Sequence, residues 1–179
     1  MKGRASLAIS LVALAAALLA APAGAQPVLA PTSACPGQTN LSAPIAEQAR
    51  AMRCLVNFAR QVRHLPPYAS SGALNRVAAH KSADILRCGE FSHEACGRPF
   101  TYWIEHLGYP ACAAGENIAW GSGRLGTPRS IFSSWMRSPR HRENILGPFE
   151  EIGIGLRAGS LKGFSGARVW TQTFGSRDC

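Results

Sequence analysis

The chain has 179 residues, of which 19 are Lys or Arg and 10 are Asp or Glu, so its formal net charge at neutral pH is +9. This length corresponds to one domain with a substantial core. The basic residues are mostly Arg and scattered, without the basic stripe and interleaved aromatics of nucleic-acid-binding proteins, so we expect no nucleic-acid partner. A positive charge favours weak contact with anionic surfaces such as a cell wall or phospholipid head groups, although it also serves solubility alone.

The first residues carry an export signal. Lys2 and Arg4 precede an apolar run over residues 7–20, and small residues at 23–25 form a cleavage site. This pattern predicts a secretory signal peptide over residues 1–25 and a secreted, extracellular protein. The run is short for a membrane span and no later segment approaches one, so we expect no transmembrane segment after cleavage. A lipoprotein anchored at Cys35 is the alternative, but that cysteine lies about fifteen residues beyond the apolar run.

All six cysteines lie after the predicted cleavage site, where 17 basic and 10 acidic residues leave a charge of +7. An even number of cysteines in an exported chain favours disulfides, although six cysteines allow fifteen pairings. Spacing suggests that Cys88 and Cys96 close a short loop and that Cys35 ties residues 26–43, an exposed arm rich in Pro, Ala, Ser and Thr, to Cys54. Cys112 and Cys179 then remain as a pair. Zinc ligation by thiolates is the weaker alternative because no Cys-x-x-Cys pair exists.

Apolar periodicity predicts four helices. Apolar residues recur at spacings of three and four over residues 45–62, which predicts an amphipathic helix ending before Pro66-Pro67. A second helix is expected from a cap at Ser70 or Ser71 to about residue 87. A third follows Pro99 and stops at Gly108. A fourth begins at Thr127-Pro128, and Pro139 either ends it or starts a new turn. Three tryptophans are expected in the core: Trp103, Trp135 and Trp170.

The last third of the chain changes to a period of two. Ile152, Ile154 and Leu156 alternate with other residues, residues 159–166 form a Gly-rich loop, and residues 169–174 form a second β-run. Two such runs across a loop predict an antiparallel hairpin, and residues 116–120 are a third candidate strand. Helices followed by strands, without regular alternation, predict an α+β fold.

Three polar segments carry the candidate chemistry. Residues 91–93 read Phe-Ser-His, residues 115–119 read Gly-Glu-Asn-Ile-Ala, and residues 135–146 read Trp-Met-Arg-Ser-Pro-Arg-His-Arg-Glu-Asn-Ile-Leu. If the fold unites them, His93, Glu116 and His141 form a site that binds a metal or moves a proton. We expect these three side chains to converge on one solvent-open cleft, with Ser138 at its rim.

Each of these residues also has a structural interpretation. Either histidine alone can simply hydrogen-bond the backbone, and Glu116 can cap a helix or bond the backbone of Ser92. Ser138 suits an N-cap of the following turn. A catalytic triad with His141 and Glu116 is conceivable, but Ser138 lacks a nucleophile-elbow setting. His80, four residues before Asp84 on one helix face, is expected to be a structural hydrogen-bonding residue.

The order of these motifs, followed by Ile-Gly-Ile-Gly at 152–155 and Trp-Thr-Gln-Thr-Phe-Gly at 170–175, resembles the CAP superfamily. This family comprises cysteine-rich secretory, antigen 5 and pathogenesis-related 1 proteins, and its domain is also called the SCP domain. The likeness runs from about residue 50 to Phe174 and is closest to the compact bacterial branch. It implies a CAP domain over residues 44–179, built as a three-layer α-β-α sandwich with a central antiparallel sheet and a shallow cleft.

The resemblance also implies a set of cleft residues. The family's tetrad of two histidines and two glutamates maps to His93, Glu116 and His141, while the second glutamate position holds Ser138. The missing carboxylate weakens any glycosidase-like acid pair. The remaining His-Glu-His set suits a weakly bound divalent cation, with Zn²⁺ the best candidate and an open position for water.

Two classes of function are compatible with these residues. One is a secreted, monomeric binding domain for a small ligand, lipid or cell-envelope component. The other is a metal-assisted hydrolase, such as a protease. The residues favour binding over catalysis, because no general base is left once the three groups ligate a metal.

Overall fold

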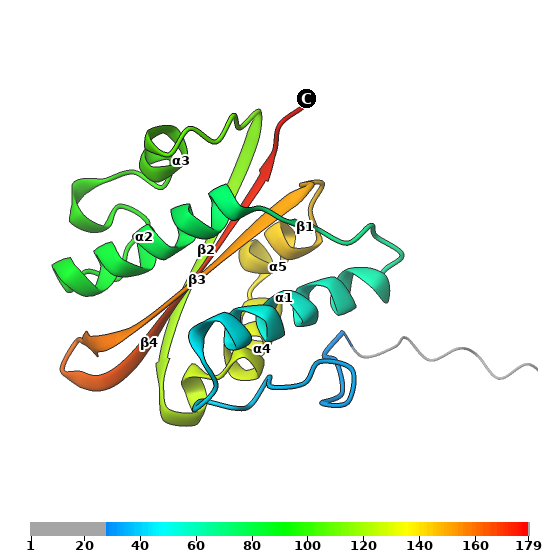
Figure 1. The fold of residues 1–179 in the computed structure, drawn as a ribbon, viewed down its shortest axis with the longest axis horizontal. Helices are drawn as coiled ribbons and strands as arrows, with labels where there is room; N and C mark the ends of the chain where they lie inside the picture. Colours follow the sequence, from blue (N-terminus) through cyan, green and yellow to red (C-terminus); the bar gives the residue numbers. More distant parts are fainter. Residues whose placement is uncertain (1–27, 179) are drawn as a thin grey trace, which may run out of the picture.

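A four-stranded sheet with helices on both of its faces forms the domain (Figure 1). The computed structural model describes residues 28–178, so the predicted signal peptide and Cys179 lie outside the described residues. The strand order is β1-β3-β4-β2, which makes β2 an edge strand. The strands are β1 Ala69–Ser70, β2 Ala113–Ser122, β3 Glu151–Leu161 and β4 Phe164–Ser176; the helices are α1 Ile45–Gln61, α2 Gly72–Cys88, α3 Tyr102–His106, α4 Pro128–Arg137 and α5 Pro139–Leu146, with short 3₁₀ turns η1 Ala95–Gly97 and η2 Gly123–Gly126.

The helix boundaries follow the capping residues of the sequence. The Ser71 hydroxyl accepts a hydrogen bond from the Leu74 N–H at the start of α2, and Gly89 in the left-handed conformation ends that helix. Thr127 caps α4 by accepting from the N–H of Ser130. The predicted caps are therefore confirmed, with Ser71 rather than Ser70 in the role. Pro139 begins a new helix, α5, rather than merely ending α4.

The hairpin is longer than its sequence pattern predicts. The expected loop over 159–166 is wrong, because β3 continues to Leu161 and β4 begins at Phe164. Lys162 and Gly163, at φ values of 50° and 81°, make the tight turn between them. The sheet is also not purely antiparallel, since the two-residue strand β1, which the sequence did not indicate, pairs parallel with β3. A run this short carries no periodicity from which to predict it.

The three layers predicted from the family resemblance are confirmed. The first layer is α2 with α3, and the third is α1 with α4 and α5 (Figure 1). Ile152, Ile154 and Leu156 point into the core on the α1 side. Gly153 and Gly155 point the other way and lie directly under the backbone of α2. The Ile-Gly-Ile-Gly motif therefore fills one side of the sheet and lets a helix approach the other.

Gly155→Ala should destabilise the domain by about 3 kcal/mol or more, because overpacking against a backbone cannot relax by a side-chain shift. A Cβ at Gly155 would lie 2.2 Å from the carbonyl carbon of Ala78 in α2. Gly159→Ala is the matched control on the same strand, since its Cβ would meet only the flexible end of Leu86 at 3.1 Å. Urea unfolding of both variants measures the difference. Equal stabilities would contradict this account of the motif.

Two of the predicted disulfides are confirmed. Cys35 bonds Cys54, and Cys88 bonds Cys96 across the loop that carries His93. Cys112 is disulfide-bonded as well, while its predicted partner Cys179 lies outside the described residues. No cysteine in residues 28–178 is free.

Most described residues of the N-terminal arm are exposed, as its composition predicts, but three of them are buried against the domain. Ala30 and Cys35 are fully buried and belong to the main core. The Gln38 side chain, also buried, donates to the Cys35 carbonyl and accepts from Arg129 of α4 at 2.6 Å. The described part of the arm, residues 28–43, is therefore packed against the domain, because Gln38 satisfies its backbone groups from within.

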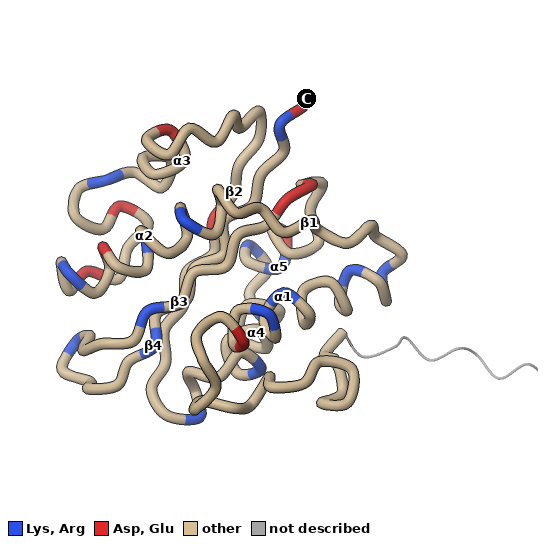
Figure 2. The backbone as a smooth tube through the Cα atoms, viewed as in Figure 1, with Lys and Arg blue, Asp and Glu red and all other residues tan. Residues whose placement is uncertain are grey.

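The charges match the scattered pattern of the sequence. Lys and Arg positions occur along the backbone of the helices of both layers and of the hairpin, without a continuous stripe (Figure 2). Within residues 28–178, no helix combines the length and the apolar character needed to cross a membrane.

Candidate functional site

The four predicted site residues lie on the edge strand β2 or on segments next to it in the fold. Glu116 is on β2 itself, and His93 lies in the loop between α2 and η1. Ser138 lies between α4 and α5, and His141 is in the first turn of α5. Because neighbouring residues of a strand point to opposite faces, Glu116 turns toward the α2 layer while Asn117 turns toward the α5 layer. We call the four residues His93, Glu116, Ser138 and His141 the β2-edge site.

His93 and Glu116 form a direct pair. Nδ1 of His93 donates to Oε1 of the Glu116 carboxylate at 2.8 Å, and the carboxylate is 2% exposed whereas the imidazole is 50% exposed. Burial raises the pKa of the Glu116 carboxyl; the hydrogen bond from His93 and the charges of Lys81 and His93 act in the opposite direction. Since Nδ1 is engaged, Nε2 is the ring nitrogen left for a ligand.

His141 lies close enough to His93 for the two rings to interact electrostatically. Burial lowers the pKa of the His141 imidazole, and the neighbouring charge of His93 lowers it further. The second imidazole is therefore held in its neutral form at neutral pH, which is the form that binds a metal or accepts a hydrogen bond. No hydrogen bond within residues 28–178 joins the His141 ring to His93 or Glu116, so the convergence of all three side chains stays a prediction.

Ser138 occupies the N-cap position of α5 without capping through its side chain. Its backbone carbonyl accepts from the Arg142 N–H at 2.9 Å, and its N–H donates to the Trp135 carbonyl at 3.0 Å. Among the hydrogen bonds of residues 28–178, none joins the Ser138 hydroxyl to His141. The backbone of Ser138 therefore connects α4 to α5, and its hydroxyl lacks the hydrogen bond to a base that would activate a nucleophile.

Two asparagines that the sequence analysis did not single out hold α5 against β2. The Asn117 amide donates to the His141 carbonyl and to the Gln172 side chain, both at 3.0 Å. The Asn144 amide donates to Oδ1 of Asn117 at 2.9 Å and to the Glu116 carbonyl at 3.2 Å. These are the asparagines of the Gly-Glu-Asn and His-Arg-Glu-Asn motifs. Their place in these motifs could have indicated a role, because an Asn near a candidate site residue can hold it in position through its amide hydrogen bonds.

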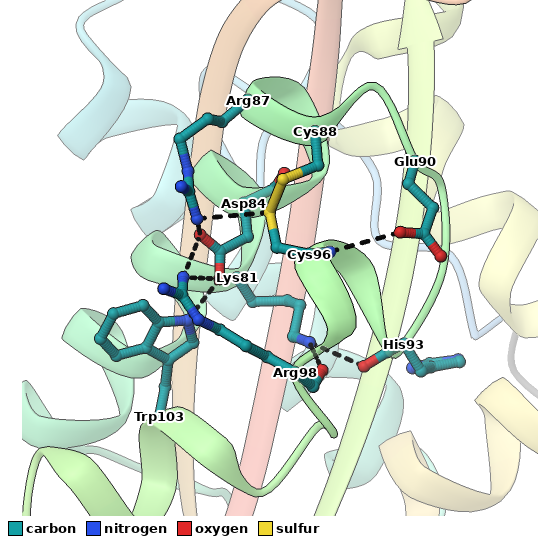
Figure 3. Close-up of polar contacts among 9 residues, drawn as sticks. All are labelled: Lys81, Asp84, Arg87, Cys88, Glu90, His93, Cys96, Arg98 and Trp103. Carbon is teal, nitrogen blue, oxygen red and sulfur yellow. Dashed lines mark hydrogen bonds and ion pairs between the residues drawn. A yellow bond between two sulfur atoms is a disulfide. The ribbon is translucent and has the colours of Figure 1, made fainter.

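A buried lysine holds the His93 loop from the other side. Nζ of Lys81, on α2, donates to the backbone carbonyl of His93 at 2.7 Å and to that of Arg98 at 3.3 Å. Lys81 is fully buried. Figure 3 shows the His93 carbonyl directed at this ammonium while its imidazole points away. The sequence analysis missed Lys81, which fixes the loop backbone and thereby the direction of the ring.

Asp84 anchors the same loop, but not through the predicted partner. Its carboxylate accepts from Arg87, Arg98 and Nε1 of Trp103 at 2.8–2.9 Å (Figure 3). These hydrogen bonds lower the pKa of Asp84 although burial opposes them. His80, expected to hydrogen-bond along the helix, instead stacks on the Trp103 ring with centroids 4.2 Å apart. Trp103 is half-buried, so its predicted place in the core is wrong, whereas Trp135 and Trp170 are core residues as predicted.

The geometry changes the role available to Glu116 in metal binding. Residues 28–178 contain no group of three His, Cys, Asp or Glu side chains placed to hold a metal ion. One oxygen of Glu116 faces His93, and the other, Oε2, is buried without a hydrogen-bond partner. A carboxylate behind a histidine orients the ring and raises its basicity. Glu116 is thus placed to orient the His93 ring, and the described residues do not present it as one of three direct ligands.

Comparison with known proteins identifies the family. A model described as the cysteine-rich secretory protein family, CAP, matches residues 54–174. No curated protein matches the chain.

Solved structures share the fold. An extracellular protein containing an SCP domain from Bacillus anthracis has a TM-score of 0.59 at 22% identity, over 74% of this chain and 44% of that one. An outer surface protein from Borrelia burgdorferi has a TM-score of 0.65 at 18% identity, over 76% and 97%. A cysteine-rich secretory protein from Staphylococcus aureus gives 0.56 at 17% identity, over 73% and 40%. The chain thus spans less than half of the Bacillus and Staphylococcus proteins, and the likeness concerns the fold.

Proposed function

The chain belongs to the cysteine-rich secretory protein family, and we propose that it is an exported binding domain whose β2-edge site takes a divalent metal together with a small ligand, lipid or envelope component. The observation that carries the proposal is the pair of imidazoles beside the edge of β2. One of them is oriented by a buried carboxylate, and the other is held neutral by its surroundings. Zn²⁺ suits such ligands and would polarise an oxygen atom of the bound ligand.

Export is supported by three observations. Residues 1–25 carry the pattern of a signal peptide, and the described residues contain two disulfides, which persist in oxidising compartments. Two of the structural neighbours are described as an extracellular protein and an outer surface protein. We therefore propose a monomer that acts outside the cell or at its surface.

Binding is favoured over hydrolysis because neither glutamate position of the family tetrad supplies an accessible base. The second glutamate position of the family tetrad holds Ser138, and the Glu116 carboxylate is buried against His93. A general base must reach the water or substrate proton that it removes. Incubation with casein, peptidoglycan and lipid vesicles, with and without zinc or a chelator, tests this point. Turnover that zinc restores after chelation would instead establish the metal-assisted hydrolase.

Zinc binding should be weak, reversible and dependent on pH. Both imidazoles must be neutral to bind a metal, so protons compete with the ion and the affinity falls as pH drops through the histidine range near ~6.5. The lowered pKa of His141 keeps that ring available to lower pH than an unperturbed histidine. Calorimetry at about pH 7.5 and about pH 5.5 measures the effect, with binding heat expected only at the higher pH.

Variants assign the ligands. His93→Ala and His141→Ala should each abolish the heat, whereas His106→Ala, an exposed histidine on α3, should leave it unchanged. The melting temperature should survive chelation, because the core and the disulfides hold the fold without metal. If the unsubstituted protein gives no heat of zinc binding at either pH, or if both the His93→Ala and His141→Ala variants bind zinc as well as it does, the metal part of the proposal fails.

A further inference from the structure

The disulfide between Cys88 and Cys96 lies at the surface, unlike the one between Cys35 and Cys54. Cys88 is the last residue of α2 and is exposed, and Cys96 in η1 is half-buried. Cys35 is fully buried in the main core, and Cys54 is partly buried against it. A thiol attacks a disulfide at one sulfur, so access to that residue affects the rate. Cys88 is therefore a better target for a thiol than either cysteine of the second bond.

A guanidinium group is held against the other sulfur of the surface disulfide. Nη2 of Arg87 donates to Sγ of Cys96 at 3.3 Å and to Oδ1 of Asp84 at 2.8 Å (Figure 3). Asp84 is itself fixed by hydrogen bonds from Arg98 and Trp103, which keeps the guanidinium beside the sulfur. A positive charge next to a sulfur stabilises its thiolate, and a more stable thiolate leaves faster in an exchange reaction.

The two sulfurs of this bond consequently have different surroundings. Cys88 ends α2, where the helix dipole places a partial negative charge that disfavours a thiolate. Cys96 has a partner in either protonation state, because Arg87 suits the thiolate and the backbone carbonyl of Asp84, 3.3 Å from the same Sγ, suits the thiol. The Glu90 carboxylate accepts from the Cys96 N–H at 3.3 Å and fixes the backbone there. This arrangement favours attack at Cys88 and departure of Cys96.

The surrounding loop stays attached to the domain when the bond opens. Nζ of Lys81 holds the backbone carbonyls of His93 and Arg98, on either side of Cys96. Cys96 has a φ of 64°, a left-handed conformation that is unfavourable for a residue with a side chain. The intact bond thus holds this residue in a conformation that it disfavours alone. Opening is local, and the two sulfurs remain near enough to pair again.

We infer that the Cys88–Cys96 bond is a thiol-exchange site, at which a low-molecular-weight thiol becomes attached to Cys88. The incoming thiol loses its proton to water, and its thiolate attacks Sγ of Cys88. A bond forms between these two sulfurs while the Cys88–Cys96 bond breaks, and the electron pair of the broken bond leaves with Sγ of Cys96. One disulfide replaces another, so the step needs no further oxidant or reductant. Return attack by the Cys96 thiolate on Cys88 releases the bound thiol. This inference does not depend on the metal proposed for the β2-edge site.

Reaction with glutathione tests the inference on the folded, exported protein. Reduced glutathione is added at neutral pH, free thiols are blocked rapidly with N-ethylmaleimide in early samples, and the modified peptides are mapped by mass spectrometry. Glutathione should appear on Cys88 and the blocking group on Cys96, while Cys35–Cys54 should open about tenfold more slowly or less. Tryptophan fluorescence should remain that of the folded protein. The absence of any adduct, glutathione on Cys96, faster opening of Cys35–Cys54, or opening only on unfolding would overturn the inference.

Arginine variants test the role of the positive charge. Arg87→Gln keeps a hydrogen-bond donor but removes the charge, so opening should slow about threefold or more and the preference for Cys88 should weaken. The expected factor is small because the Arg87 side chain is 59% exposed and solvent screens its charge. Arg87→Lys should retain most of the rate, and Arg76→Gln, an exposed arginine on the same helix, should leave it unchanged. Equal rates for Arg87→Gln and the unsubstituted protein, or an equal loss in Arg87→Lys, would contradict the assignment of Cys96 as the charge-stabilised leaving group.

Discussion

Lys81→Met should destabilise the domain by about 3–5 kcal/mol, the range seen when one partner of a buried charged network is removed. Methionine reproduces the length of the lysine stem, so lost packing is a small part of the effect. What disappears is the ammonium that satisfies the carbonyls of His93 and Arg98 and that lies near the buried Glu116. Without this positive charge the pKa of Glu116 should rise further, and the His93 loop should lose its anchor.

Urea unfolding at neutral pH measures the loss, and Lys162→Met, at the exposed hairpin turn, serves as the matched control with an expected change within about 0.5 kcal/mol. A second measurement separates a local from a global effect. The NMR signals of the His93 ring should broaden or shift in the Lys81 variant even under conditions where it stays folded. A stable Lys81→Met protein with an unchanged His93 would show that the ammonium does not hold the loop.

The burial of Lys81 could have been inferred from the sequence, although a search for motifs does not detect it. On α2 the buried apolar residues Leu74, Val77, Ala78 and Ile85 recur at helical spacing, and position 81 falls in the same row. A lysine on the buried face of a helix is unfavourable unless its ammonium group donates hydrogen bonds to buried acceptors. Those acceptors lie 12 and 17 residues further along the chain, so the position was predictable as unusual but its partners were not.

Arg60 on α1 is a second charged residue on the buried face of a helix. It is 1% exposed, and its guanidinium donates to the carbonyls of Pro66, Ile145 and Gly147 at 2.7–3.0 Å. Burial lowers the pKa of this arginine. Ile145 lies in the last turn of α5 and Gly147 directly follows it, so Arg60 ties the end of the helix that carries His141 to α1. Sequence patterns identify helices from local spacing, and a contact across 85 residues leaves no local trace.

The parts that were predictable are those with a local physical signal. Ser71, Thr127 and Pro128 begin helices for reasons contained within four residues, and alternating residues from 152 to 156 identify a strand. The candidate site followed from ordered motifs, and the structure joins His93 to Glu116 as that order suggested. The anchoring of the arm was not predictable, because Pro-, Ser- and Thr-rich composition describes loops in general and does not reveal the Gln38–Arg129 contact that fastens this one.

The residues of the sequence motifs make different contacts and therefore have different roles. Glu116 and Asn117 are neighbours on β2 and face opposite layers, so one orients His93 and the other holds the backbone of His141. Ser138 replaces the second carboxylate without assuming a new contact at the site. These contacts fix the direction of the His93 ring and the position of the His141 backbone beside β2.

Reduction of the disulfides should lower the melting temperature markedly, and the two described bonds should contribute unequally. Cross-linking residues 19 apart, as in Cys35–Cys54, restricts the unfolded chain by about 3 kcal/mol, and a separation of 8, as in Cys88–Cys96, by about 2.5 kcal/mol. Cys35 is also fully buried and fastens the arm to the core. Replacing the Cys35–Cys54 pair with serines should therefore cost about 3–5 kcal/mol, or roughly 6–20 °C in melting temperature.

The Cys88–Cys96 pair is the matched comparison. Its replacement with serines should cost about 2–3 kcal/mol, because Lys81 and Asp84 continue to hold the ends of the same loop. Calorimetric melting of the two double variants and of the reduced protein measures the order of the effects, and thiol labelling of the untreated protein should find all six cysteines oxidised. Two or more reactive thiols in the native protein would contradict the disulfide framework. A larger loss from the Cys88–Cys96 variant would show that the disulfide, rather than the buried lysine, is what holds His93 in place.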